Sequence, residues 1–303
     1  MSLGSDRDSG CAMAGSESIG EELQRAAALE AIEPLAAADL YAVLLEREPA
    51  CVEASNALER LGDPRRFGAW MRVNCTIHPR DDLLGFIARG AHGQNPIRAY
   101  LADGWRTLSE LMLLLERLDR PLLAFDSVLE FACGYGRFTR HLAHAMPGRV
   151  AAADILPGSV EFVGRQFGVE AFPSDFEPEQ IRFPRRYELV FVLSLFTHLP
   201  VEDWGRWLKV LAAAVAPGGM LVFSVHSEAL AAAQGVRFDD RGVHFVPSSE
   251  SPSLDPARYG TTFTTRAVVE RELHKAIGKR PLHYADDAFW VGQDAVVVVP
   301  DGA

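Results

Sequence analysis

The fold is decided by one stretch, Val128-Leu129-Glu130-Phe131-Ala132-Cys133-Gly134-Tyr135-Gly136-Arg137-Phe138-Thr139. An apolar run ends in an acid, passes through a turn of small residues and resumes with apolar residues at the period of a helix. This order predicts a strand, a tight turn and a helix. Glycine tolerates positive φ and leaves the backbone open, and the N-terminus of the helix faces whatever binds in the turn. The stretch therefore predicts a cradle for a nucleotide-sized ligand.

Two residues of this stretch restrict the ligand. The dinucleotide fingerprint needs a third glycine, and Thr139 stands in that place, which disfavours a nicotinamide dinucleotide. Glu130 ends the strand just before the turn, where its carboxylate would repel a pyrophosphate but could hold a cationic amino group. We expect a ligand that carries an ammonium group.

The segment from Glu130 to Gly136 resembles motif I of class I S-adenosylmethionine (SAM)-dependent methyltransferases. The resemblance implies SAM as cofactor, with its amino-acid end against the turn. One departure is Ala132, which stands where the family has its first glycine and is tolerable only if its φ stays negative. The alternative is a structural turn in another doubly wound sheet. The resemblance assigns these residues to the cofactor site: Glu130, Ala132, Cys133, Gly134, Gly136 and Arg137.

Two later acids fit the same cofactor. Asp154 ends a second predicted strand about twenty residues past the glycines, where an acid can accept hydrogen bonds from both ribose hydroxyls, with Ile155 beside it. Its alternative role is that of a turn residue or helix cap. The next strand leads into Ser174, Asp175 and Phe176, which resemble the family's adenine-binding loop. The alternative for Asp175 is a solvated loop acid.

The run from Tyr187 to His226 resembles the methyltransferase segment with a central strand, a Thr-His-Leu-Pro loop, a long helix and a Pro-Gly-Gly turn. Leu193 and Ser194, where the strand ends, are expected at the cofactor. His198 and His226 follow the fourth and fifth strands, and both are candidate bases because histidine titrates near neutrality. Their alternative role is structural hydrogen bonding.

An aromatic residue and a glycine shortly before motif I lie over the methionine end of SAM in similar methyltransferases. Tyr100 and Gly104 occupy those places here and are expected to form part of a lid. The alternative for Tyr100 is a half-buried aromatic residue on an amphipathic helix. Separate helices are predicted over residues 95–103 and 108–118.

The C-terminal part predicts an insertion followed by the end of the sheet. Residues 238–259 are rich in Asp, Ser and Pro, and we expect a substrate lid there. Residues 282–289 and 294–299 are predicted strands with so short a link that they must form an antiparallel hairpin. The predicted fold is α/β: a Rossmann-like sheet of seven mostly parallel strands with this hairpin, preceded by a small all-α region.

The N-terminal part is predicted to contain a disordered tail over residues 1–18 and helices over residues 19–70, with the methyltransferase domain over residues 71–303. Residues 39–54 resemble a single tetratricopeptide-like helical pair, and one such unit cannot bury its own apolar face. The helices are therefore expected to form a homodimer or to pack on the main domain.

Composition excludes several classes of function. The net charge of −11 disfavours nucleic acid and anionic membranes as partners. The four cysteines are scattered and suggest no disulfide framework, which fits a reducing cytoplasm. No apolar run is long enough to span a membrane. The sequence shows no cluster of three metal-ligating residues, so no metal is predicted.

These features predict a SAM-dependent methyltransferase acting on a small molecule, by O-methylation of a hydroxylated compound such as a sugar or secondary metabolite. The alternative is a catalytically weak SAM-binding scaffold whose N-terminal helices bind a partner protein. The acceptor pocket is expected between the 194–199 loop and the insertion, lined by Phe196, His198 and His226, with Tyr259 as a further candidate.

Overall fold

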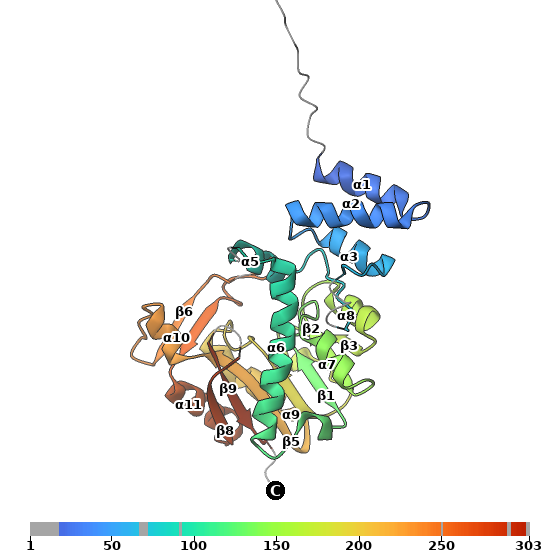
Figure 1. The fold of residues 1–303 in the computed structure, drawn as a ribbon. Helices are drawn as coiled ribbons and strands as arrows, with labels where there is room; N and C mark the ends of the chain where they lie inside the picture. The colour runs from blue at the N-terminus through green and yellow to red at the C-terminus, as the bar shows by residue number, and fades with distance from the viewer. Residues whose placement is uncertain (1–17, 67–71, 91–92, 250, 290–291, 301–303) are drawn as a thin grey trace, which may run out of the picture.

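The structure, a computed structural model, describes residues 18–66, 72–90, 93–249, 251–289 and 292–300. At the centre of these residues lies one nine-stranded sheet (Figure 1). Its strands are β1 (Val128–Phe131), β2 (Val150–Asp154), β3 (Glu170–Pro173), β4 (Tyr187–Val192), β5 (Val215–His226), β6 (Val243–Val246), β7 (Thr261–Thr264), β8 (His283–Phe289) and β9 (Gln293–Val298).

The strand order confirms the predicted α/β fold. Strands β3, β2, β1, β4 and β5 lie side by side and parallel, whereas β9 is antiparallel to β5 and β8 is antiparallel to β9. Residues 290 and 291, in the predicted hairpin turn, lie outside the described residues. The chain order reverses between β1 and β4, and the crevice beyond the carboxyl ends at such a reversal is where open α/β sheets bind ligands.

Two strands were not predicted. β6 and β7 pair antiparallel in and next to the segment that was expected to be an irregular insertion. β7 also pairs with the end of β5, where His226 lies opposite Phe263. The sheet therefore has nine strands and not seven, and the additional pair places the insertion beside the carboxyl end of β5.

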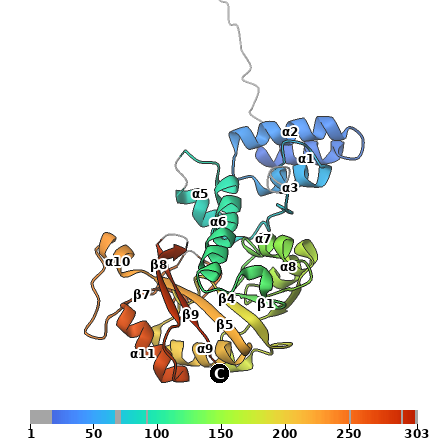
Figure 2. The ribbon, with the colours of Figure 1, turned by 60° about the horizontal axis from the view of Figure 1, so that its bottom comes forward.

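Helices cover both faces of the sheet, and this explains why the parallel strands are almost continuously apolar. α6 (Pro96–Glu116), α7 (Thr139–Ala145) and α8 (Ser159–Phe167) lie on one side, and α9 (Val201–Ala213) and α11 (Arg266–Ile277) lie on the other (Figure 2). All residues of β1 and β2 are buried.

α6 is one helix of 21 residues, so the prediction of two separate helices was wrong. Gly104 lies within this helix, at a position where another element packs so closely that no side chain would fit. A Cβ atom there would lie 2.2 Å from the carbonyl oxygen of Arg137. Two further helices, α5 (Asp82–Gly90) and α10 (Glu228–Ala233), were not predicted.

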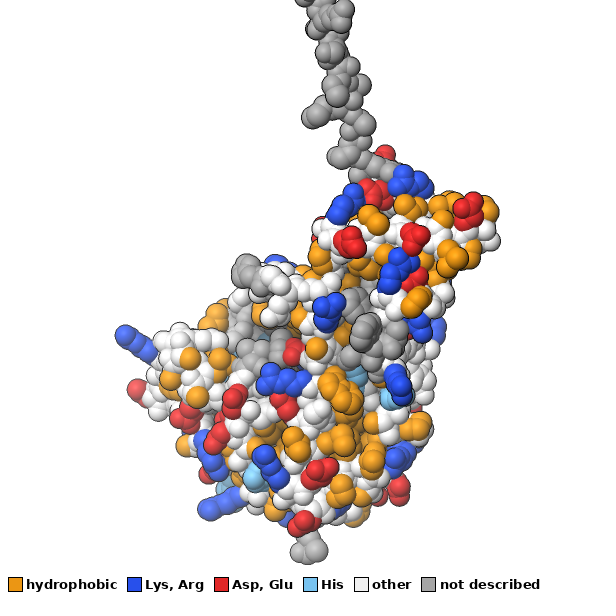
Figure 3. Space-filling model, in the orientation of Figure 1, with side chains coloured by type: hydrophobic (Ala, Val, Ile, Leu, Met, Phe, Trp, Pro, Cys, Tyr) orange, Lys and Arg blue, Asp and Glu red, His pale blue; other side chains and the backbone are white. Residues whose placement is uncertain are grey.

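The helices predicted over residues 19–70 are present as α1 (Ile19–Leu29), α2 (Pro34–Arg47) and α3 (Val52–Leu61). They share a small core that includes Ala26, Tyr41 and Leu58. Apolar and charged side chains are mixed on the visible face of these helices (Figure 3). Residues 1–17 of the predicted tail, and the proposed boundary at residue 70, lie outside the described residues.

Candidate active site

A cavity of about 610 Å³ lies at the carboxyl ends of the parallel strands. Its size is within the range of small-ligand sites. It is lined by every predicted cofactor-binding and catalytic residue except Gly104 and Gly136. The members from the predicted set are Tyr100, Glu130, Ala132, Cys133, Gly134, Arg137, Asp154, Ile155, Ser174, Asp175, Phe176, Leu193, Ser194, His198 and His226.

The turn after β1 is left-handed at three positions. Ala132 has φ 62°, Gly134 has φ 55° and Gly136 has φ 80°. The prediction that Ala132 keeps a negative φ was therefore wrong, and this alanine adopts the backbone of the glycine it replaces. A Cβ atom at Gly134 would have nothing within 4 Å, so a ligand can approach the backbone there. Gly136 faces the opposite way, because its Cβ would lie 2.5 Å from the ring of Phe167.

Glu130 is a buried carboxyl group at the end of β1. Burial raises its pKa to about 8, although a hydrogen bond from Thr139 and the charge of Arg137 oppose the rise. The Thr139 hydroxyl donates to Glu130 Oε2 at 2.6 Å. The residue that replaces the third glycine of the dinucleotide fingerprint thus supports the acid. Arg137, also buried, forms an ion pair of 3.4 Å with Asp103 of α6.

Asp154 closes β2 beside the glycine turn. Its Oδ2 accepts a hydrogen bond from the backbone N–H of Gly134 at 2.6 Å, and its Oδ1 accepts one from Leu156 at 2.8 Å. Burial raises the pKa of Asp154, and the backbone N–H donors oppose that rise. Asp154 therefore shapes the turn as well as lining the cavity.

The two residues expected in a lid have different places. Tyr100 is fully buried, and its hydroxyl donates to Asp81 Oδ2 at 2.7 Å, so it is not the half-buried aromatic residue of the alternative interpretation. It lines the cavity together with Asp81. Gly104 lies away from the cavity, where α6 packs on the backbone of Arg137 and on His141. We therefore correct its role to helix packing.

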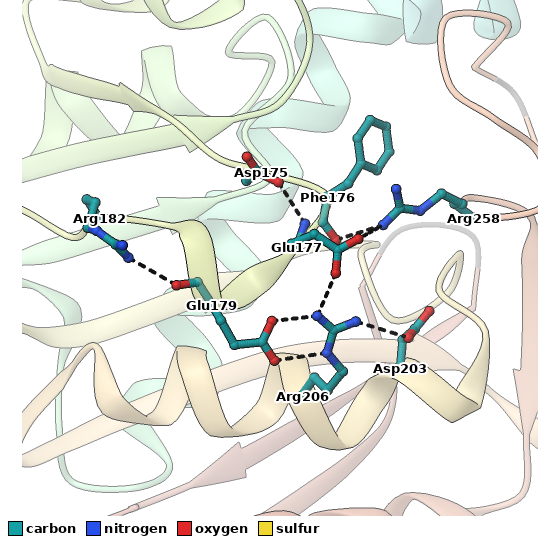
Figure 4. A network of polar contacts seen from close by, with 8 residues as sticks. All are labelled: Asp175, Phe176, Glu177, Glu179, Arg182, Asp203, Arg206 and Arg258. Atoms are coloured by element: carbon teal, nitrogen blue, oxygen red, sulfur yellow. Dashed lines mark hydrogen bonds and ion pairs between the residues drawn. The ribbon is translucent and has the colours of Figure 1, made fainter.

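The loop after β3 is tied to two distant elements (Figure 4). Asp175 Oδ1 accepts a hydrogen bond from the backbone N–H of Glu177 at 2.8 Å. Arg258 of the insertion donates to Glu177 Oε1 at 2.6 Å and to the carbonyl oxygen of Phe176 at 3.2 Å. Its guanidinium carbon lies 4.7 Å from the centre of the Phe176 ring. Arg206 of α9 donates to Glu177 from the other side at 2.6 Å.

Ser194, directly after β4, has a left-handed backbone with φ 63°. Its N–H donates to Ser224 Oγ at 2.8 Å, and the side-chain amide of Gln293 donates to Ser194 Oγ at 2.9 Å. Ser224 Oγ in turn donates to Gln293 Oε1 at 2.6 Å. Three strand ends are thereby joined beneath the cavity. Gln293 lines it and was missed as a site residue, because its partner lies 99 residues away.

Both candidate bases are held by backbone carbonyl groups. Nδ1 of His198 lies 2.6 Å from the carbonyl oxygen of Gly260, and Nδ1 of His226 lies 2.8 Å from that of Thr262. A carbonyl oxygen only accepts, so Nδ1 must carry the proton and Nε2 is the basic nitrogen of each neutral ring. Burial lowers the pKa of His226 to about 4.

Aromatic rings support these histidines. Tyr259 stacks on His198 with ring centres 4.4 Å apart, and Phe263 stacks on His226 at 4.5 Å. Tyr259 lines the cavity as expected. Phe196 does not, which corrects its predicted place: it is fully buried against Trp204 and Phe223.

The remaining wall comes from α5 and the insertion. Ser251 Oγ donates to Asp82 Oδ2 at 2.7 Å, which joins the start of α5 to the insertion across 169 positions of sequence. Phe86 and Arg89 of α5 also line the cavity. The insertion was expected here as a segment, with only Tyr259 named. The lining residues that were not named individually are Asp81, Asp82, Leu83, Phe86, Arg89, Ser248, Ser249, Ser251, Leu254, Arg258, Thr261 and Phe263.

Two absences hold for the described part of the chain. No group of three or more His, Cys, Asp or Glu side chains there could hold a metal ion. Among the helices that the structure describes, none has the length and apolar character needed to cross a membrane.

Comparison with known proteins agrees with the site. Residues 128–219 match the family described as methyltransferase domain. No curated protein matches the sequence.

Several solved structures are similar. A SAM-dependent methyltransferase from Clostridium acetobutylicum is 16% identical, with 64% of this chain and 91% of that chain covered and a TM-score of 0.48. Magnesium protoporphyrin IX methyltransferase from Synechocystis, with bound S-adenosylhomocysteine (SAH), is 17% identical, with 68% and 88% covered and a TM-score of 0.45. An amino pentose methyltransferase from Micromonospora echinaspora is 17% identical, with 63% and 90% covered and a TM-score of 0.44.

The matched residues contain β1, the glycine turn, β2 to β4 and the helices between them, which build the part of the cavity beside the glycine turn. The chain therefore contains, over residues 128–219, a match to the methyltransferase domain family.

Proposed function

We propose that the enzyme methylates a hydroxyl group of a small hydroxylated molecule, such as a sugar or a secondary metabolite. The observation that carries the proposal is the pair of histidines beyond β4 and β5. Each presents Nε2 as its basic nitrogen, and both line the cavity that the cofactor-side residues share.

In this proposal the cofactor lies along the ends of β1, β2 and β3. The open backbone at Gly134 admits its amino-acid end, with Glu130 facing the ammonium group and Arg137 the carboxylate. Asp154 retains acceptor capacity beyond its two backbone bonds and would receive the ribose hydroxyls. Asp175 and Phe176 would flank the adenine.

The acceptor side is rich in neutral polar groups. Of the charged side chains there, Asp82 is bonded to Ser251 and Arg258 to Glu177. Asp203 Oδ1 lies 3.8 Å from Arg206 Nη1, and Arg89 is exposed. Such a lining suits hydroxyl groups better than a polyanion, because neutral donors and acceptors pair with hydroxyls without desolvating a charge. The neutral polar members are Ser194, His198, His226, Gln234, Ser248, Ser249, Ser251, Tyr259, Thr261 and Gln293.

The protein has one chemical task beyond placement. SAM supplies a methyl group that its sulfonium already activates, and a hydroxyl acceptor must lose its proton as the new C–O bond forms. His198 is our candidate for the base, accepting that proton at Nε2. His226, whose pKa is about 4, is neutral at pH 7 but weakly basic, so it suits a hydrogen-bond acceptor that orients the hydroxyl.

The test is transfer of a labelled methyl group from SAM to a panel of sugars, glycosides and phenolic metabolites. With an acceptor identified, His198→Gln should lower turnover by about 10²–10⁴ and leave SAH affinity nearly unchanged. His226→Gln should mainly raise KM for the acceptor. His144→Gln, at an exposed position of α7, is the matched control and should be fully active.

Two results would contradict the proposal. Full turnover of both the His198 and the His226 variant would remove the histidines from the mechanism. Methylation of amino sugars without methylation of their hydroxyl counterparts would assign the acceptor atom to nitrogen.

A further inference from the structure

Residues 73–81, here called the strap, run from the N-terminal helices to α5. They have no regular secondary structure, yet Val73, Cys75 and Ile77 are buried. These side chains share a cluster with Val52 of α3 and with residues of α5 and α6. The strap therefore lies between the N-terminal helices and the methyltransferase core.

One side of the strap is held by α3. The side-chain amide of Asn56 donates to the carbonyl oxygen of Ile77 at 2.8 Å, and Asn56 Oδ1 accepts from the N–H of Ile77 at 2.9 Å. Ile77 is fully buried and belongs to no strand, so a side chain of α3 provides the hydrogen bonds that its backbone N–H and carbonyl group need.

The other side of the strap is held by Arg140 of α7, which is 2% exposed. Its Nη1 donates to the carbonyl oxygens of Asn74 at 3.1 Å and Thr76 at 3.0 Å, and its Nε donates to that of Gly136 at 3.0 Å. A buried guanidinium needs acceptors for its donors, and Nη2 of Arg140 already has no hydrogen-bond partner among the described residues, so the guanidinium depends on these three bonds. Two of these three acceptors belong to the strap and the third belongs to the glycine turn.

The strap also touches the cofactor side directly. The ring of His78 stacks on that of Tyr135, between the two glycines of the turn, with centres 4.2 Å apart and planes 6° apart. Asp81, at the end of the strap, accepts the hydroxyl of Tyr100 and lines the cavity. The strap thus contacts the glycine turn at Gly136, through Arg140, and at Tyr135.

We propose that the N-terminal helices are part of the cofactor site, and that Asn56 is a positioning residue that acts through the strap and Arg140 on the glycine turn. The inference rests on the proposed placement of SAM in that turn. Release of the strap would leave Arg140 without two acceptors in a buried place, so the guanidinium would move and free the Gly136 carbonyl. If the glycine turn adopts its binding conformation for only a fraction of the time, the apparent Kd for SAH equals the intrinsic Kd divided by that fraction.

The test is SAH binding to the full chain by calorimetry. Asn56→Ala removes both bonds to Ile77 from a half-buried position, without touching the cavity. We expect Kd for SAH to rise at least about fivefold. Asn56→Asp keeps the acceptor for the Ile77 N–H and should lie between wild type and Asn56→Ala.

Arg60→Ala is the matched control. It breaks the ion pair between Arg60 and Glu30 inside the N-terminal helices and leaves the strap intact, so Kd should stay within about twofold of wild type. Hydrogen exchange should show faster exchange at the Tyr135 and Gly136 amides in Asn56→Ala but not in Arg60→Ala.

A purely structural role for Asn56 would lower the thermal midpoint and leave Kd unchanged, and that result would overturn the inference. Equal losses of affinity in Asn56→Ala and Arg60→Ala would also overturn it, because the effect would not pass through the strap. Absence of SAH binding by the wild type would instead overturn the cofactor placement, and the inference with it.

Discussion

Ala132 and Ser194 hold left-handed backbone at the carboxyl ends of the neighbouring strands β1 and β4. Such a conformation costs a residue with a Cβ atom about 1–2 kcal/mol, so the surrounding structure must hold it. Ser194 is held by its bonds to Ser224 and Gln293. Two of the five left-handed non-glycine residues in the described part of the chain thus lie where the cavity meets the sheet.

The strain at Ala132 can be measured. Ala132→Gly removes the Cβ penalty but increases the freedom of the unfolded chain, so the free energy of unfolding should rise by about 0–1 kcal/mol. Ala132→Val places a β-branched side chain at φ 62° and should lower it by at least about 1 kcal/mol. Urea denaturation measures both. A glycine variant that is clearly less stable than wild type would contradict the strained turn.

Glu130 should make stability fall as pH rises. Its pKa is about 8 in the folded state against an ordinary value of 4.5, so between these pH values the folded protein holds a proton that the unfolded chain releases. The free energy of unfolding then decreases by up to about 1.4 kcal/mol per pH unit. Glu130→Gln, which cannot titrate, should lack this decrease.

The useful window for this comparison is pH 6.5 to 8. Below it His141 and His226, whose pKa values burial lowers to about 4, act in the opposite direction, because the unfolded chain binds their protons first. Urea titrations of wild type and Glu130→Gln at several pH values test the prediction. Parallel curves in that window would show that Glu130 is already ionised.

Some residue roles could be predicted because they follow from chain order. Glu130 and Asp154 lie at the carboxyl ends of β1 and β2, and His198 follows β4; the carboxyl ends of such parallel strands meet at one edge. The φ of Ala132 could not be predicted, since an alanine is compatible with either sign and only the packing of the turn decides it. The assignments of individual residues to cofactor or acceptor stay predictions.

At the scale of elements, the loop after β3 and the insertion are joined by charged side chains at the surface (Figure 4). Glu177 receives Arg206 from α9 and Arg258 from the insertion. Only Arg258 also contacts Phe176, through its ring and its carbonyl oxygen. Arg258 is therefore the connection between the proposed adenine loop and the acceptor side.

Removing this connection should loosen the insertion without unfolding the protein. In Arg258→Ala, hydrogen exchange over residues 251–260 should become severalfold faster. The thermal midpoint should stay close to wild type, since exposed ion pairs contribute little to global stability.

Arg206→Ala is a close control for that experiment. Arg206 shares Glu177 and has the same side-chain exposure of 43% as Arg258, but it does not touch the insertion. In Arg206→Ala, hydrogen exchange over residues 251–260 should match wild type. The connection would be refuted by equal exchange rates in the two variants.

The elements that were missed share a physical reason. β6 and β7 have four residues each, too few for a clear alternation, and they are stabilised by pairing with each other and with the end of β5. The prediction left residues 104–107 out of α6. Glycine usually weakens a helix, but Gly104 lies inside α6 and admits the backbone of Arg137. In both cases tertiary contacts outweighed local preference.

At the scale of the molecule, the cavity is assembled from segments that are far apart in sequence. Strand ends form its floor, while α5 and the insertion contribute the wall that Asp82 and Ser251 join. Local patterns reveal the floor, because strand, turn and helix are consecutive. Composition indicated the insertion as a lid, but no local pattern reveals α5 or its contact with the insertion, which spans 169 positions of sequence.

The N-terminal helices expose apolar side chains that a homodimer could cover. Ile32 is 75% exposed and Leu35 is 79% exposed, at the start of α2 and just before it. The helices also contact the strap through α3, which agrees with the alternative that they pack on the main domain. Homodimerisation through these helices stays a prediction.

Cofactor binding should protect the molecule unevenly from hydrogen exchange. At 100 times its Kd, SAH should stabilise the folded state by about 2.7 kcal/mol, which slows exchange through global unfolding about 100-fold. Added protection should also appear in α5 and in residues 251–263, because local opening of either segment removes part of the cavity wall and would release SAH. Amides of α1, which contributes no cavity residue, should keep their rate of local exchange. Slowing confined to the glycine turn, with α5 and the insertion unchanged, would mean that these two segments do not enclose the cofactor.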